Sequence, residues 1–183
     1  MTHRTTAELE AHEDHLRAAP AQAGTLELVV RRPAVGEREI LEECRLDEAG
    51  GLVGDNWLER ATSIAIAEGR HLQAQINVMS ARMVKFLAAT IDEQALAGDQ
   101  LFLDLDISFA NLPAGSRVAI GDEAVIEITK KPHNGCAKFM ARFGDDATAF
   151  VNSPVGKELR LRGLNARVVA GGVIRPGDKV HKL

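Results

Sequence analysis

One cysteine, Cys136, has a setting that suits thiolate chemistry. It stands at the start of a predicted short helix within residues 132–144. The first turn of a helix leaves backbone N–H groups unpaired and carries partial positive charge, to which Lys138, Arg142 and a protonated His133 would add. Because the thiolate is the form that attacks electrophiles and binds soft metals, the segment predicts a cysteine that carries sulfur, attacks an electrophile or ligates a metal.

The residues alone leave alternatives open. A cysteine such as Cys136 can also be a small packing residue in a core. His133 lies three residues before it, so a tight turn would bring the imidazole to the sulfur as a base or hydrogen-bond partner, although the spacing does not require this. The other cysteine, Cys44, follows Glu42 and Glu43 in a strand-like run. Neighbouring acids raise the pKa of a thiol, so a packing role is favoured for Cys44.

Two further patterns could take part in binding. Residues 50–57 hold three glycines beside Asp55 and Asn56, so backbone could approach a ligand closely while the side chains offer hydrogen bonds. An ordinary turn is the alternative there. His12 and His15 are spaced to share a helix face, but zinc needs more ligands, and two solvated histidines are the simpler interpretation.

Composition favours one compact domain. The chain has 183 residues, of which 45% are hydrophobic and 26% charged. A domain of this size buries roughly 70% of the surface of its unfolded chain, so it needs neither disulfides nor a structural metal. The two cysteines are therefore available for other roles.

Charge and hydropathy exclude several classes of partner. The net charge is -4, with 22 basic and 26 acidic residues interspersed along the chain, so we expect no nucleic-acid partner. Apolar runs fall short of the ~20 residues that a membrane helix needs, and no apolar signal core follows Met1. We therefore expect a cytoplasmic protein with no membrane partner, in a reducing compartment that keeps its thiols free.

The predicted elements form a mainly β, α+β fold. Residues 6–19 have a helix-forming composition and end at Pro20, which predicts a short leading helix or a loosely attached arm. Residues 80–89 predict one interior helix, with Ser80 as its N-cap. Short β-like runs separated by Gly, Pro and Asp turns predict a barrel; they are residues 25–32, 38–46, 101–107, 118–120, 124–129, 166–170 and 179–181. We expect a helical arm over residues 1–24 and a barrel domain over 25–183.

An ordered set of short motifs resembles the MOSC family, named after the C-terminal domain of molybdenum cofactor sulfurases. The resemblance runs from about residue 25 to 180. Each motif is short, and their order along the chain makes the set specific. They are Gly51-Leu52-Val53-Gly54-Asp55, Asn111-Leu112 with Gly115, Ile120-Gly121-Asp122, Gly135-Cys136-Ala137-Lys138-Phe139, Arg142-Phe143-Gly144, Arg162-Gly163-Leu164-Asn165-Ala166-Arg167-Val168 and Gly177-Asp178.

The resemblance implies a MOSC-type β-barrel and a role linked to the molybdenum cofactor. In the family the motif cysteine carries sulfur as a persulfide or ligates the molybdenum of a pterin cofactor (molybdopterin). The implied enzyme classes are a sulfurtransferase-like protein and a molybdenum-dependent oxidoreductase that reduces N-hydroxylated compounds. On this chain Cys136 would be the catalytic cysteine and the metal ligand, with His133 beside it. The implied cofactor-binding residues are Lys138, Arg142, Asn111, Asp55 and Asn56.

The chain also departs from larger relatives. It carries no aminotransferase-like sulfurase domain, so pyridoxal phosphate is not expected to bind, and sulfur would come from a separate cysteine desulfurase. The recipient would be a molybdoenzyme partner. The context His-Asn-Gly-Cys-Ala-Lys-Phe differs from the Pro-Cys contexts of some stand-alone reductases.

Two other interpretations remain. A non-catalytic module could use the same cations to bind a small-molecule ligand, such as a carboxylate or phosphorylated metabolite. Exposed strand edges could also pair two copies of the chain into a homodimer, which is compatible with either function.

Overall fold

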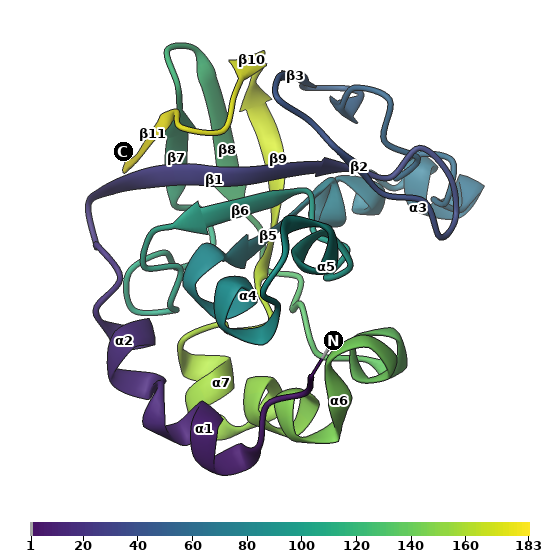
Figure 1. The fold of residues 1–183 in the computed structure, drawn as a ribbon. Coiled ribbons are helices and arrows are strands. Elements are labelled where there is room, and N and C mark those ends of the chain that lie inside the picture. The colour runs from purple at the N-terminus through teal and green to yellow at the C-terminus, as the bar shows by residue number, and fades with distance from the viewer. Residues whose placement is uncertain (1) are drawn as a thin grey trace.

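A closed barrel forms the centre of the molecule in this computed structural model, which describes residues 2–183 (Figure 1). The strands follow the order β11-β7-β8-β9-β5-β6-β1, and β1 also pairs with β11, so seven strands close the ring. All neighbours are antiparallel except β5 and β6, which are parallel. The strands are β1 (Ala23–Arg31), β5 (Ile76–Ser80), β6 (Leu101–Asp104), β7 (Arg117–Ile120), β8 (Ala124–Ile128), β9 (Leu164–Ala170) and β11 (Lys179–Lys182).

Four further strands lie outside the ring. β2 (Glu39–Ile40) extends β1, while β3 (Cys44–Asp47), β4 (Gly51–Leu52) and β10 (Gly172–Ile174) form a small sheet. Because closure pairs both sides of the ring strands, unpaired edges remain mainly on these short outer strands. The predicted edge-to-edge association of two copies would therefore use these outer strands.

Strand prediction succeeded where apolar and polar residues alternate or turns mark the ends. It missed β5, whose five residues are all buried. A strand buried on both faces and paired in parallel lacks the alternation that identifies a half-exposed strand. The predicted mainly β, α+β barrel is confirmed.

Most helices gather below the barrel in Figure 1, whereas α3 lies at its right. Ser80 caps α4, as predicted, and the side chain accepts from the N–H of Met83. The predicted leading helix is two short helices that meet at His12, and the first begins with a capping box between Thr5 and Glu8. The helices are α1 (Thr6–Ala11), α2 (Glu13–Arg17), α3 (Ser63–Ala67), α4 (Ala81–Leu87), α5 (Ile91–Ala95), α6 (Ala137–Asn152), α7 (Pro154–Glu158) and the 3-10 helix η1 (Arg70–Ala74).

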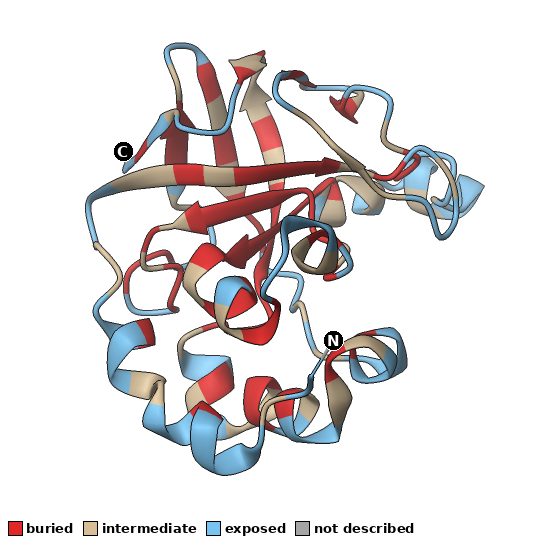
Figure 2. Cartoon of the chain, in the orientation of Figure 1, coloured by how far each residue is buried: buried red, intermediate tan, exposed pale blue. Residues whose placement is uncertain are grey.

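Two apolar cores share the strands β1, β5 and β6. Side chains such as Leu101 and Leu103 fill the barrel, whereas the alternate residue Phe102 points into a second core against the helices. Figure 2 shows buried residues along these strands and on parts of α4 and α6. Leu9 and Leu16 are buried in the second core, so α1 and α2 are packed against the body of the protein.

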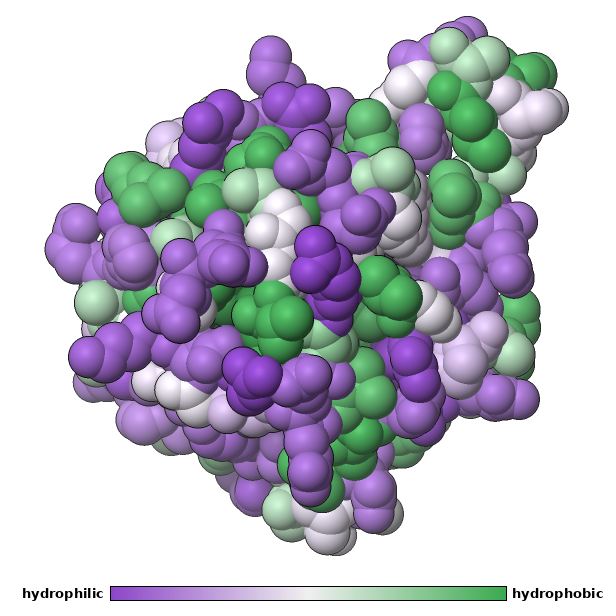
Figure 3. Space-filling view, turned by 90° about the horizontal axis from the view of Figure 1, so that it is seen from above, coloured by the Kyte–Doolittle hydropathy of each residue, from purple (hydrophilic) through white to green (hydrophobic). Residues whose placement is uncertain are grey.

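A lobe that includes α3 projects from this body, at the right in Figure 1 and at the upper right in Figure 3. Ile64 and Ile66 of α3 are exposed there. Among the described residues, no helix combines the length and apolarity needed to cross a membrane.

Candidate functional site

Cys136 is exposed and is the N-cap residue of α6. Its partial burial raises the thiol pKa, but the N–H groups of Phe139 and Lys138 and the charges of Arg162 and Lys138 outweigh this effect, so the pKa lies below its ordinary value. Neither N–H meets the full geometry of a capping hydrogen bond. The stabilisation is therefore best described as that of a helix N-terminus and nearby cations acting together.

Two hydrogen bonds join Gly135, just before α6, to Asn152 at the end of the same helix. Gly135 N–H donates to Asn152 Oδ1 at 3.0 Å, and Asn152 Nδ2 donates to Gly135 O at 3.2 Å. The two ends meet because Gly144, at φ 89° and ψ 173°, breaks the helical path between them. A Cβ on residue 135 would lie 2.9 Å from Asn152 Nδ2, which explains the glycine before the cysteine.

Cys136 opens into a cleft of about 520 Å³ with an excess of positive charge. Four of its cations, Arg38, Arg60, Lys138 and Arg142, have no carboxylate partner among residues 2–183. Burial, and then other guanidinium groups, lower the pKa of Arg38 and Arg60. Like charges held together in this way attract an anion.

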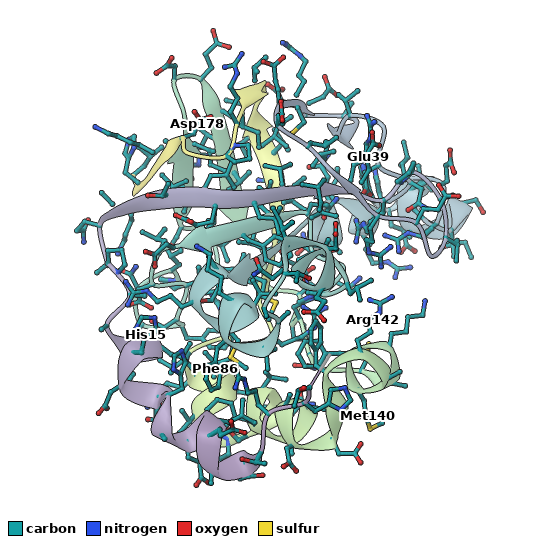
Figure 4. All side chains as sticks on the ribbon, in the orientation of Figure 1. His15, Glu39, Phe86, Met140, Arg142 and Asp178 are labelled. Carbon is teal, nitrogen blue, oxygen red and sulfur yellow. The ribbon has the colours of Figure 1, made fainter. Side chains whose placement is uncertain are left out.

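Two of these guanidinium groups converge at Gly98. A Cβ placed there would lie 3.1 Å from Arg38 Nη2 and 3.3 Å from Arg142 Nη1. Arg142 Nη1 also donates to Leu96 O at 2.5 Å. Figure 4 shows Arg142 extending from α6 into the region between that helix and the segment that carries Glu39.

A buried polar network forms one wall of the cleft. Arg32 pairs with both oxygens of Asp55 at 2.8 and 2.9 Å and donates to Asn77 Oδ1 at 2.8 Å. Asn77 donates to Asn165 at 2.6 Å, and Asn165 donates to the carbonyls of residues 131 and 132. The network thus fixes the loop that leads to Cys136 relative to the strand ends.

A second buried carboxylate lies beside this loop. Asp99 Oδ2 accepts from Arg162 Nη1 at 2.6 Å, and Asp99 Oδ1 lies 2.9 Å from His133 Nε2. Asp99 Oδ1 and His133 Nε2 are too poorly aligned to form a hydrogen bond. They form an ion pair when His133 is protonated. Burial raises the pKa of Asp99, but the charges of Arg162 and His133 prevail and hold it below its usual value.

Four buried polar atoms on cleft residues form no hydrogen bond within the described chain. They are the acceptor Asn56 Oδ1, the donors Arg38 Nε and Arg162 Nε, and His133 Nε2, which lies beside Asp99 without a hydrogen bond. Buried polar groups are normally satisfied, so an anionic ligand that also carries a hydrogen-bond donor fits this cleft. Among residues 2–183 no three His, Cys, Asp or Glu side chains are grouped to hold a metal ion. Of the residues that line the cleft, only Cys136 offers a soft sulfur ligand.

The structure brings most of the predicted site residues together. Asn56, His133, Cys136, Lys138 and Arg142 all line the cleft. The other two predicted residues lie outside the cleft.

Asp55 and Asn111 do not line the cleft. Asp55 is buried behind the wall, where it acts through Arg32 and accepts from the N–H of Trp57. Asn111 donates to the carbonyls of Ala21 and Asp106, and it therefore secures loops elsewhere. Both residues were expected to bind cofactor directly. In the structure Asp55 positions the wall through Arg32, and Asn111 secures loops outside the cleft.

The sequence did not indicate several residues in or behind the cleft wall. Arg162 stands in a motif that carries the family resemblance and could have been found there. Asp99 comes just before β6 and gave no local signal. Arg32, Arg38 and Arg60 come from a loop-rich stretch whose path depends on tertiary contacts.

The remaining candidates have structural roles. Cys44 is buried, and its burial raises its pKa to about 12, which agrees with the predicted packing role. His12 stacks on Phe86 with ring centroids 3.8 Å apart and lies 4.7 Å from His15. No third metal-binding side chain joins these histidines in the described part of the chain.

Comparisons with known proteins agree with the fold. The family model described as MOSC domain matches residues 54–181. The crystal structure of YuaD from Bacillus subtilis is similar with a TM-score of 0.61 and 17% identity, over 87% of this chain and 95% of that one. For YiiM from Escherichia coli the TM-score is 0.52 and the identity 20%, over 87% and 69%. No curated protein matched the chain. At such identities these structures show the fold alone.

Proposed function

Because the chain belongs to the MOSC domain family, which is associated with the molybdenum cofactor, we propose that Cys136 is the functional thiolate of this protein and the ligand for the molybdenum of a pterin cofactor. One observation carries the proposal. An exposed thiol with a lowered pKa opens into a cleft that has four cations without carboxylate partners in residues 2–183. A soft anionic sulfur suits the metal, and the cations suit the phosphate of the cofactor.

The cleft residues fit such a group on chemical grounds. Arg38, Arg60, Lys138 and Arg142 would neutralise its phosphate, and Asn56 Oδ1 would accept a hydrogen bond from a pterin N–H. When bound, the cofactor would supply the two-electron chemistry that reduction of N-hydroxylated compounds requires.

The chain's own residues supply binding and proton handling. Cys136 remains ionised because the helix start and its neighbouring cations stabilise its charge. His133 lines the same cleft beside the buried carboxylate of Asp99, where it can hold a proton close to the ligand. Asp55 orients Arg32 in the wall and has no direct contact with the cleft.

Sulfur carriage is the second candidate function, and the exposure of Cys136 favours it. In this step the Cys136 thiolate attacks the outer sulfur of a persulfide on a cysteine desulfurase. A new S–S bond forms at Cys136, the S–S bond of the donor breaks, and the donor leaves as a thiolate. A molybdoenzyme partner would then take up the transferred sulfur.

Elemental analysis and intact-mass spectrometry of protein made in a cofactor-producing host test both candidates. Molybdenum that is retained by the wild type and by Cys44→Ala, but lost in Cys136→Ser, would support ligation. A reducible mass increment of one sulfur on Cys136 without molybdenum would support carriage. Absence of both from wild-type protein, with unchanged anion affinity in Cys136→Ser, would favour the non-catalytic anion-binding module instead.

The cations provide a further test. Arg38→Ala and Arg142→Ala should each reduce the amount of cofactor retained, because they remove charge from the cleft. Lys157→Ala is a matched control, since Lys157 does not line this cleft. Equal retention in all three variants would contradict the assigned phosphate-binding role.

A further inference from the structure

A second cavity lies beside the loop that leads to Cys136. It has a volume of about 230 Å³ and is lined by four further cations, Lys130, Lys131, Lys157 and Arg160. No carboxylate lines it in the described part of the chain. His133 and Arg162 line both this cavity and the Cys136 cleft, so the two adjoin, but Cys136 itself lines only the cleft.

Arg160 gives this cavity its most unusual property. Its side chain is buried, with 7% of the residue exposed, and no carboxylate among residues 2–183 pairs with it. Nη1 donates to the carbonyls of Leu112 at 2.6 Å and Ile107 at 3.4 Å. Burial lowers the pKa of Arg160 to about 10. A buried cation without a counter-ion is unfavourable, and an anionic ligand would remove that cost.

Three lysines add positive charge to this cavity and form no ion pair within residues 2–183 that would stabilise the fold. Lys130, Lys131 and Lys157 are exposed, and none forms an ion pair within the described chain. They come from two segments that the fold brings to one cavity: the end of β8 and helix α7. Their positions suit one compact multivalent anion.

The cavity also has an apolar side. Phe109 lines it with 56% of its surface exposed, and the Arg160 guanidinium lies 3.8 Å from the ring centroid. Val151 and Leu164 contribute further apolar lining. An exposed aromatic ring next to several cations suits a ligand with a flat apolar group attached to an anion.

We propose that this cavity is a second binding site, separate from the Cys136 cleft, for a small organic phosphate whose phosphate contacts the cations and whose flat apolar group packs on Phe109. Four cations favour a phosphate dianion over a carboxylate. The small volume limits the apolar part to about one ring. The inference does not depend on the function proposed for Cys136.

Titration with phenyl phosphate and with inorganic phosphate, followed by backbone amide shifts in NMR spectra, tests the proposal. We expect phenyl phosphate to shift amides of residues 129–134 and 156–164 and to bind more tightly than inorganic phosphate. Lys157→Ala should weaken binding about tenfold, the effect of losing one charged hydrogen bond. Phe109→Ala should reduce the affinity for phenyl phosphate to that for inorganic phosphate.

Matched variants separate the two sites. Arg142→Ala alters the Cys136 cleft only, so it should leave these amide shifts and the affinity unchanged. Lys157 and Phe109 are exposed, so both variants should fold, whereas Arg160 is avoided because it donates to two loop carbonyls. Shifts confined to residues 32–38 and 136–142, or unchanged affinity in Lys157→Ala, would overturn the proposal. Equal binding of the two ligands by the wild type would overturn its apolar part.

Discussion

His133 Nε2 lies 2.9 Å from Oδ1 of the buried Asp99, whose other oxygen accepts from Arg162 at 2.6 Å. One carboxylate therefore joins the loop before Cys136 to the segment before β9. Arg162 also lies near enough to lower the pKa of Cys136. Asp99 is thus a positioning residue for two groups that face the cleft.

Removing this carboxylate should destabilise the fold. In Asp99→Asn the buried Arg162 loses its counter-ion, and breaking such a pair costs about 3–5 kcal/mol in the free energy of unfolding. Urea unfolding at pH 7 measures this loss. Asp145→Asn, at an exposed position on α6, should change stability by less than about 0.5 kcal/mol. Equal stability of the two variants would contradict the role of Asp99.

The same pair should make stability depend on pH in the acid range. The pKa of Asp99 is lower in the folded protein than in the unfolded chain, where it is about 3.9. The stability that Asp99 contributes is therefore fully present above about pH 4 and is lost as pH falls through its lower folded pKa. The difference between wild type and Asp99→Asn should be largest near neutral pH and should shrink below pH 4. A difference that grows on acidification would reverse the assigned sign.

Cys136 should react faster than an ordinary thiol at neutral pH. Its pKa is lowered, so the rate of alkylation by iodoacetamide should rise with a midpoint below the value of about 8.5 for a free cysteine. Peptide mass spectrometry distinguishes it from Cys44, which should remain unmodified until the protein unfolds.

Lys138→Ala should raise that midpoint, because the substitution removes a positive charge but retains the backbone N–H. Lys179→Ala on β11 is the matched control and should leave the midpoint unchanged. If Cys136 titrates like a free cysteine in the wild type, the thiolate hypothesis is wrong.

The sequence predicted those parts of the site that are local. Cys136 at a helix start, the nearby Lys138 and Arg142, and His133 three residues before all lie within one short segment, and all four line the cleft. Periodicity and turn residues likewise predicted most of the barrel strands, because alternation reports one buried face directly.

The opposite wall of the cleft could not be predicted in this way. Arg38 and Arg60 line the cleft from loops whose path is set by contacts far apart in sequence, such as the pair between Arg32 and Asp55. Asn111 illustrates the opposite case. A polar residue in a family motif looked like a pocket residue, but its amide secures loop carbonyls.

Asn152 should control the start of α6. Asn152→Ala removes the acceptor of the Gly135 N–H and the donor to its carbonyl, which we expect to cost about 1–2 kcal/mol of stability. The loosened helix start should also raise the pKa of Cys136, as measured by alkylation. Asn152→Asp keeps the acceptor and should lose less stability. Identical effects of the two variants would exclude this hydrogen bond as the cause.

Phe102 should be a major contributor to stability. It is fully buried in the core between the barrel and the helices, and its neighbours along β6, Leu101 and Leu103, point into the barrel instead. Phe102→Ala should reduce the free energy of unfolding by about 3–5 kcal/mol, because it leaves a cavity in that core. Ile64→Ala, at a 63% exposed position, should cost less than about 0.5 kcal/mol. A similar small cost at both positions would mean that the helices do not pack tightly on the outer face of β6.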